Sequence, residues 1–268
     1  MKFEYLTYLC CPVCRLDLVL HEDITEGKRV KEGQLICNSC SANYPITNYV
    51  PRFIDTQDYA DSFGSQWNAF AKAQLDDQQT SESTLRFDSE VGWDVGNLAD
   101  KSIIEIGSGA GRFIDVVSKR GVKLAIGVDV TSAVDASQDN LGERDNVLFV
   151  QADAFNLPIK DSSVDFAYSI GVLHHTPDPQ LAFESMVNTV KNSGNVAVSL
   201  YEISLYSRPN RNTLKVVTME LLWAMNMWRC ELFRSFTTKL PDGLMIAYCK
   251  LFIPILHYLN KVPILGLI

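Results

Sequence analysis

The chain has 268 residues, of which 47% are hydrophobic, and this length can bury one α/β domain plus a small accessory domain. Its formal net charge of −8 argues against a protein that grips a nucleic-acid backbone over a large area, although local basic patches remain open. Residues 1–5 contain no long apolar run, so we expect no export signal and a cytoplasmic location in which thiols stay reduced.

Two Cys-x-x-Cys pairs, Cys11 with Cys14 and Cys37 with Cys40, lie near the N-terminus with 22 residues between them. Each pair puts two thiolates on one tight turn, and two such turns complete a closed, four-sulfur structural zinc site. Cys10 could take the place of Cys11, but it would change the spacing, so we favour Cys11. Because the cysteine count is odd and no export signal is expected, zinc is favoured over disulfides.

The segment around the second cysteine pair, residues 36–53, resembles the zinc-ribbon domain of small activator proteins of tRNA and protein methyltransferases. The resemblance covers residues 6–54, and similar ribbons occur fused in front of methyltransferase domains. We therefore expect a zinc-ribbon domain over residues 1–54, and we infer no substrate from it.

Residues 55–99 form a polar segment rich in Gln, Asp and Ser. The spacing of Phe63, Trp67 and Phe70 predicts a helix over 59–75 with these rings on one face. Two interpretations stay open: the rings pack on a sheet as core, or the segment is a lid over a cofactor and substrate. Residues 61–67, followed by Arg86-Phe87, resemble the segment that closes over the cofactor in a group of bacterial methyltransferases.

The most informative stretch is residues 103–112, an apolar run that contains Glu105 and is followed by Gly107, Gly109 and Gly111. It predicts a strand that ends in a tight turn and opens a helix, where glycine permits positive φ and close approach of a ligand. The G-x-G-x-G spacing differs from that of dinucleotide folds and of phosphate-binding loops.

Two further apolar runs, residues 124–129 and 147–154, carry acidic residues at their ends. Asp129 could accept hydrogen bonds from both ribose hydroxyls of a nucleoside, and Asp153 could receive an adenine amino group. In this order the motifs resemble those of a class I S-adenosylmethionine-dependent methyltransferase of the type 11 group, over about residues 101–201.

The resemblance assigns a role to each of these positions. Glu105 would orient the glycine loop or the methionine amino group, and the three glycines would line the methionine and the ribose. Asp129 would bind the ribose, Asp153 the adenine amino group, and the Ala154 backbone would lie beside the adenine ring. The implied cofactor is S-adenosylmethionine.

The rest of this region alternates strand and helix, with strands over 163–170 and 195–201, a helix over 179–191 and a turn over 191–194. The pattern predicts a doubly wound, Rossmann-like, mostly parallel sheet over residues 100–205, with ligands at the carboxyl ends of its strands. Residues 171–176 would then face the site. His174 is the favoured general base over His175, and the alternative is that it only positions a loop.

The tail, residues 206–268, is strongly apolar, and we cannot find in it the two antiparallel strands with which a class I domain should end. It is either an incomplete C-terminal part or a helical cap. We expect helices that pack on the sheet or on a second copy as a homodimer; peripheral membrane contact and a lipid-like substrate are the alternatives.

These features predict S-adenosylmethionine-dependent methyl transfer to an O, N or C atom of a small or lipid-like metabolite. One alternative is an RNA base methyltransferase of the guanine type whose ribbon contacts RNA, which the acidic charge disfavours. The other is a non-catalytic, methyltransferase-like binding subunit, against which the complete set Glu105, Asp129 and Asp153 argues. The absence of an Asn-Pro-Pro motif after the fourth strand argues against adenine or glutamine N-methylation.

Overall fold

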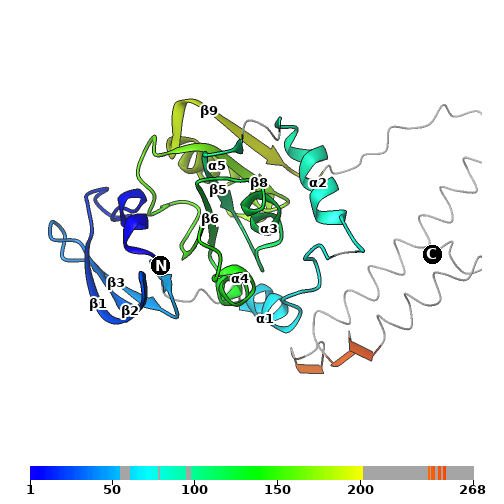
Figure 1. The fold of residues 1–268 in the computed structure, drawn as a ribbon, viewed down its shortest axis with the longest axis horizontal. Coiled ribbons are helices and arrows are strands. Elements are labelled where there is room, and N and C mark those ends of the chain that lie inside the picture. Colours follow the sequence, from blue (N-terminus) through cyan, green and yellow to red (C-terminus); the bar gives the residue numbers. More distant parts are fainter. Residues whose placement is uncertain are drawn as a thin grey trace, which may run out of the picture. The chain divides into compact units, whose positions relative to one another are not determined.

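The structure is a computed structural model that describes residues 1–54, 61–77, 79–94, 98–201, 241, 243–244, 247–248 and 250–251, with residues 61–63 as backbone only. The chain divides into two compact units, residues 1–201 and 202–268. Every helix and strand labelled in Figure 1 belongs to the first unit. The predictions for the tail fall almost wholly outside the described residues. No helix in the described part of the chain is long and apolar enough to cross a membrane.

The N-terminal part is a small antiparallel sheet that follows a 3₁₀ helix, Phe3–Tyr8. Its strands are β1 (Val19–Glu26), β2 (Arg29–Ile36), β3 (Asn43–Thr47) and β4 (Val50–Pro51), paired in chain order. Val30, Leu35 and Ile46 are buried and form the small core of this sheet. The strands fall within the predicted ribbon, residues 1–54.

The ribbon joins the larger part of the unit along one edge. Arg52 bridges Gln151 in parallel, and Leu9 bridges Ile159 in antiparallel fashion. The Arg15 guanidinium donates to the carbonyl oxygens of Leu157 (2.5 Å) and Ile159 (2.6 Å). One hydrophobic cluster runs through both parts, so the ribbon is packed on the α/β core of the same unit.

The larger part holds a five-stranded sheet whose neighbouring strands are all parallel. The strands are β5 (Ser102–Ile106), β6 (Leu124–Asp129), β7 (Val147–Gln151), β8 (Val164–Ile170) and β9 (Val190–Ser199), in the order β7-β6-β5-β8-β9. Side chains on β5 and β7 are buried throughout, as expected for a sheet covered on both faces. The order reverses between β5 and β8, and ligands bind at such a point. The predicted Rossmann-like parallel sheet is confirmed.

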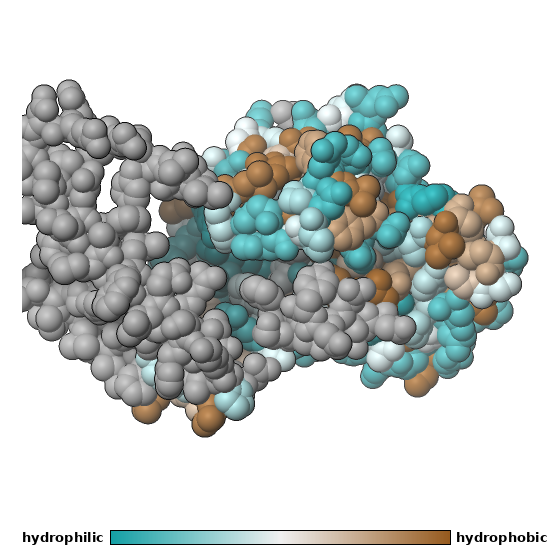
Figure 2. All heavy atoms as spheres, turned by 180° about the vertical axis from the view of Figure 1, so that it is seen from behind, coloured by the Kyte–Doolittle hydropathy of each residue, from teal (hydrophilic) through white to brown (hydrophobic). Residues whose placement is uncertain are grey.

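Within the described part of the first unit, the helices beside the sheet are α1 (Asp61–Ala69), α2 (Glu82–Val91), α3 (Arg112–Ser118), α4 (Ala133–Leu141) and α5 (Pro179–Asn188). α1 packs on α4, α2 packs on α3 and β9, and α5 packs on β9 (Figure 1). The buried Phe87 ring of α2 meets Tyr168 of β8 edge to face at 5.2 Å. Seen from behind, the described surface carries hydrophobic residues in separate small groups among hydrophilic ones (Figure 2).

Several predicted boundaries were wrong. The helix predicted over 59–75 spans only Asp61–Ala69 among the described residues, and turns follow it. The helix predicted over 179–191 ends at Asn188, because Val190 already pairs with Val164 in the buried sheet. The turn predicted at 191–194 is therefore an irregularity inside β9, after which Asn195 pairs with Phe166.

Candidate functional site

A cavity of about 350 Å³ opens at the carboxyl ends of the parallel strands. It brings together most of the residues that the sequence predicted to bind a nucleoside cofactor. The predicted residues that line it are Glu105, Gly107, Gly109, Asp129, Asp153 and Ala154. Gly111 and His174 are not among its lining residues.

The three glycines of the loop have positive φ but different surroundings. At Gly107, with φ +80°, a Cβ would lie 2.5 Å from the Val172 side chain. Gly111, with φ +86°, precedes α3, and a Cβ there would lie 2.8 Å from Leu141 on α4. Gly107 therefore permits the loop to lie against the β8 end, whereas Gly111 permits two helices to pack closely.

Asp129, at the end of β6, is held by its neighbours in one orientation. Its Oδ2 accepts from the Gly109 amide at 2.8 Å, and its Oδ1 accepts from the Thr131 amide at 2.9 Å and the Thr131 hydroxyl at 2.7 Å. Burial raises its pKa, and these hydrogen bonds oppose the rise. A carboxylate offers about four acceptor positions, so a ligand hydroxyl would have to use the remaining one or replace the Thr131 hydroxyl.

Glu105, on β5, is a buried acid, with 2% of its surface exposed. The Tyr168 hydroxyl donates to its Oε2 at 3.1 Å. Burial raises its pKa to about 8, with a smaller contribution from the charge of Asp129. No cation lies within ion-pair distance of it among the described residues. A positively charged ligand group in the cavity would favour its ionised form.

Asp153 and Ala154 follow β7 and reach the same cavity. Asp153 Oδ1 accepts from the Phe155 amide at 3.0 Å, which fixes the turn after the strand. The Ala152 amide donates to the Asp129 carbonyl at 3.0 Å, so the ends of β6 and β7 are tied together. The acidic residues of two neighbouring strands thereby meet at one edge, as the parallel arrangement requires.

The two histidines differ in what they reach. His175 lines the cavity, whereas His174 packs its ring on His175 (centroids 4.0 Å apart) and on Tyr201 (4.6 Å). Both ring nitrogens of His174 are buried without a hydrogen-bond partner among the described residues, and burial together with His175 lowers its pKa. The geometry therefore offers His175, in place of the favoured His174, for contact with a substrate.

The segment before the sheet contributes directly to the cavity. Trp67 of α1 lines it, and its ring lies 3.4 Å from the position of a Cβ on Gly109. Of the two interpretations of the aromatic stripe, this placement fits the lid for Trp67. The Phe63 side chain lies outside the described residues.

Val172 and Thr176 belong to the predicted site-facing segment 171–176, but other lining residues were not predicted, among them Gln74, Arg112 and Tyr201. Arg112 directly follows the last glycine of the loop, at the start of α3. This position in the sequence could have predicted that it lines the cavity. Arg86 belongs to the segment that resembles one closing over the cofactor, and the helix that carries it, α2, packs on α3.

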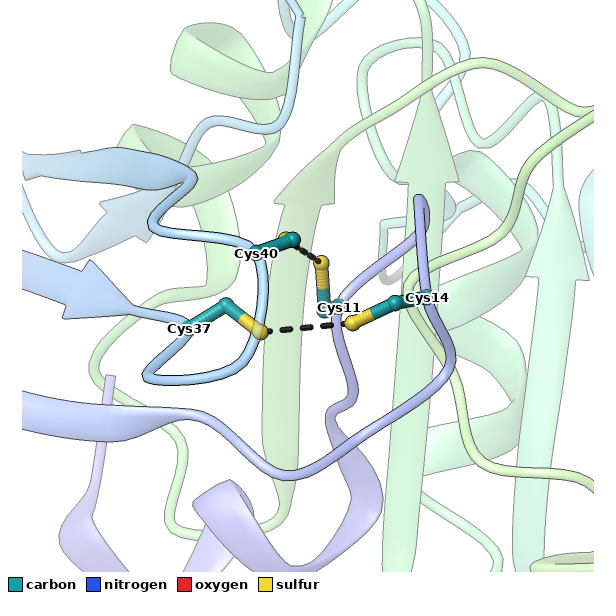
Figure 3. A group of neighbouring side chains, drawn as sticks. All are labelled: Cys11, Cys14, Cys37 and Cys40. Carbon is teal, nitrogen blue, oxygen red and sulfur yellow. Dashed lines mark hydrogen bonds between the residues drawn. The ribbon is translucent and has the colours of Figure 1, made fainter.

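The four predicted metal ligands converge in the ribbon (Figure 3). The sulfur atoms of Cys11, Cys14, Cys37 and Cys40 all lie within 4.8 Å of one another. The distances Cys11–Cys40 (3.5 Å) and Cys14–Cys37 (3.3 Å) are too long for disulfides. Cys10 is buried but is not part of the group. Four thiols in this arrangement fit a tetrahedral zinc ion.

Comparison with known proteins points to one family. Residues 104–198 match the model of the family described as "Methyltransferase domain". An O-methyltransferase from Aspergillus sclerotiorum is 27% identical over 128 residues, which are 46% of this chain and 48% of that protein. A tRNA U34 carboxymethyltransferase from Ruthia magnifica is 25% identical over 140 residues, 44% of each chain. The chain thus spans about half the length of these curated relatives.

A solved complex from Haloferax volcanii, between the Trm112 methyltransferase activator and a candidate methyltransferase, contains a chain that is 16% identical. The match covers 55% of this chain and 62% of that one, with a TM-score of 0.45. The family match covers the strands and the glycine loop that form the cavity. Residues 104–198 are thus similar to a methyltransferase domain.

Proposed function

We propose that the protein transfers the methyl group of S-adenosylmethionine to a small or lipid-like acceptor. The observation that carries the proposal is the cavity at the sheet edge, where Glu105, the glycine loop, Asp129 and Asp153 come together from three strands. Asp129 would accept from the ribose, Asp153 with the Ala154 backbone would hold the adenine, and Glu105 would face the methionine ammonium group.

S-adenosylmethionine supplies a methyl group on a sulfonium, which an acceptor atom displaces in line. The chain then has to bind the cofactor and the acceptor, orient them for the displacement, and exclude water from the cavity. A general base is needed only if the acceptor atom carries a proton. His175, Thr176 and Tyr201 lie beside the end of β8 and line the cavity. We assign acceptor contacts to this group, with His175 as the residue that could take a proton.

The acceptor class follows from the rest of the lining. Trp67, Phe113, Val172 and Tyr201 present apolar surface to the cavity, which favours a small or partly apolar acceptor over a polyanion. The runner-up is an RNA base, because one relative acts on tRNA. The exposed strand β1 of the ribbon carries Glu22 and Asp23, whose negative charges disfavour contact with phosphate.

We further propose that the ribbon holds one structural zinc ion through Cys11, Cys14, Cys37 and Cys40. The sulfur geometry supports this assignment, and a four-thiolate site leaves no position for water. The zinc would stabilise the ribbon, whose own core is small, and would take no part in methyl transfer.

The cofactor assignment is tested by calorimetric titration of S-adenosylhomocysteine into the wild type and Asp129→Ala. We expect micromolar binding that weakens at least tenfold in the variant, about 1.4 kcal/mol. Asp165→Ala is the matched control: Asp165 also accepts a backbone amide, from Ser102 at 2.9 Å, but it lies near the start of β8. Equal losses in both variants, or no binding to a folded wild type, would contradict the proposal.

A further inference from the structure

Gln151 is a polar residue at the end of the otherwise apolar strand β7, and the proposed function gives it no role. Only 2% of its surface is exposed. A buried side-chain amide is costly unless its oxygen and its nitrogen both find hydrogen-bond partners. The partners of Gln151 come from two different parts of the first unit, the ribbon and the wall of the cavity.

The ribbon holds one half of Gln151. The Arg52 guanidinium donates to the side-chain oxygen at 2.7 Å, and the Phe53 amide donates to the main-chain carbonyl oxygen at 2.8 Å. Arg52 is itself fixed by Asp135 of α4, at 2.5 Å. Because a guanidinium can only donate, it orients the Gln151 amide with its oxygen toward the ribbon and its nitrogen away from it.

The other half of Gln151 reaches the turn that follows β6. The Gln151 Nε2 donates to the carbonyl oxygen of Val130 at 3.2 Å. Val130 lines the cavity between Asp129 and Thr131, and Thr131 is hydrogen-bonded to the Asp129 carboxylate. The Ala152 amide ties the Asp129 carbonyl to β7, and the Gln151 side chain ties the next carbonyl along the chain. Gln151 therefore supports the turn that carries the carboxylate assigned to the ribose.

We propose that Gln151 is a positioning residue through which the ribbon strengthens binding of the cofactor ribose. The inference rests on the proposed function, because it concerns the regulation of the ribose site assigned there. Arg52 orients the amide of Gln151, the amide holds the Val130 carbonyl, and the turn keeps Asp129 in one orientation. Such preorganisation raises affinity, because the cost of ordering the turn is not paid when the ligand binds.

The test uses Gln151→Glu, which keeps an oxygen for Arg52 but replaces the donor to Val130 by a second acceptor. In calorimetric titration we expect S-adenosylhomocysteine to bind about fivefold more weakly than to the wild type, the ratio expected for the loss of one hydrogen bond. Because Arg52 keeps its partner, the variant should fold with the ribbon attached. Near-ultraviolet circular dichroism and urea unfolding check this.

The matched control is Arg15→Met. Arg15 is another ribbon arginine that donates to the α/β core, but its partners are the carbonyl oxygens of Leu157 and Ile159, which do not line the cavity. Its replacement should lower the urea midpoint and leave the affinity for S-adenosylhomocysteine within twofold of the wild type. A loss of affinity as large as in Gln151→Glu would show that affinity simply follows stability, and would overturn the proposal.

A double-mutant cycle separates positioning from a general structural role. If Gln151 acts through the turn, its effect on affinity depends on the Asp129 carboxylate. In an Asp129→Ala background, Gln151→Glu should then weaken binding of S-adenosylhomocysteine by less than twofold, because the two changes affect one interaction. Equal factors in the two backgrounds, or an unchanged affinity in the single variant, would be incompatible with the positioning role.

A measurement on the wild type does not depend on the folding of any variant. Coupling between two sites is reciprocal, so saturating S-adenosylhomocysteine should slow hydrogen exchange at the Phe53 amide, which donates to Gln151, by at least twofold. The Arg15 amide donates to the Cys11 carbonyl within the ribbon, and its exchange rate should not change. Exchange at Phe53 that is the same with and without ligand would contradict the coupling. Failure of S-adenosylhomocysteine to bind the wild type would instead contradict the proposed function.

Discussion

Glu105 shows how a single buried residue ties the fold to ligand chemistry. Its side chain is buried beside the cavity and accepts a hydrogen bond from Tyr168, and burial raises its pKa to about 8. The unfolded chain ionises this group near its ordinary value of 4.5. Between these two values the unfolded state loses a proton that the folded state keeps, so rising pH destabilises the protein without ligand.

We therefore expect Glu105→Gln to remove part of the pH dependence of stability. The free energy of unfolding of the variant should rise relative to the wild type as the pH increases from about 4.5 to about 8. Urea denaturation of both proteins without cofactor, at several pH values, measures this difference. Parallel pH profiles would show that Glu105 keeps an ordinary pKa in the folded protein.

At the scale of elements, the contact between the ribbon and β7 is the feature that organises the first unit. Arg52 lies beside the sheet edge and donates to the Gln151 side chain at 2.7 Å and to Asp135 of α4 at 2.5 Å. The buried Gln151 in turn donates to the carbonyl of Val130, a cavity residue, at 3.2 Å. The ribbon thereby covers the edge strand and touches the loop after β6.

Replacing Arg52 by Met should destabilise the protein by about 2 kcal/mol, because it leaves a buried amide oxygen and a carboxylate without their partner. Equilibrium urea unfolding measures the change. Lys160→Met is the control: Lys160 pairs at 2.5 Å with Asp17, whose side chain is 82% exposed, so its loss should cost less than about 1 kcal/mol. A loss in Arg52→Met no larger than in this control would mean that the contact contributes little.

The ribbon also predicts which cysteine binds metal. Cys10→Ser should keep about one zinc ion per chain, whereas Cys11→Ser should retain much less zinc. The reason is that Cys11 is one of the four clustered cysteines and Cys10 is not. Metal analysis of the purified proteins by mass spectrometry checks this. A chelator should lower the melting temperature of the wild type, since a closed four-thiolate site contributes to folding. Equal zinc content in the two variants would contradict the assignment.

For the whole molecule, the sequence predicted those features of the fold and of the site that depend on local residue patterns. The buried parallel strands were visible as apolar runs, and the glycine loop and acidic strand ends came together because parallel strands share one carboxyl edge. The predicted C-terminal end of α5 was wrong, because Val190 pairs with Val164 in the sheet and cannot continue the helix. Tyr201 was missed as a lining residue for the same reason, since tertiary packing alone brings it to the cavity.

The central claim is that this cavity binds the adenosyl cofactor, and the most direct measurement is a crystal structure of the chain with S-adenosylhomocysteine. We expect the ribose hydroxyls at Asp129, the adenine beside Asp153 and Ala154, and the methionine ammonium group beside Glu105. Density for the nucleoside elsewhere, or a cavity left without it in crystals grown at saturating ligand, would contradict the account.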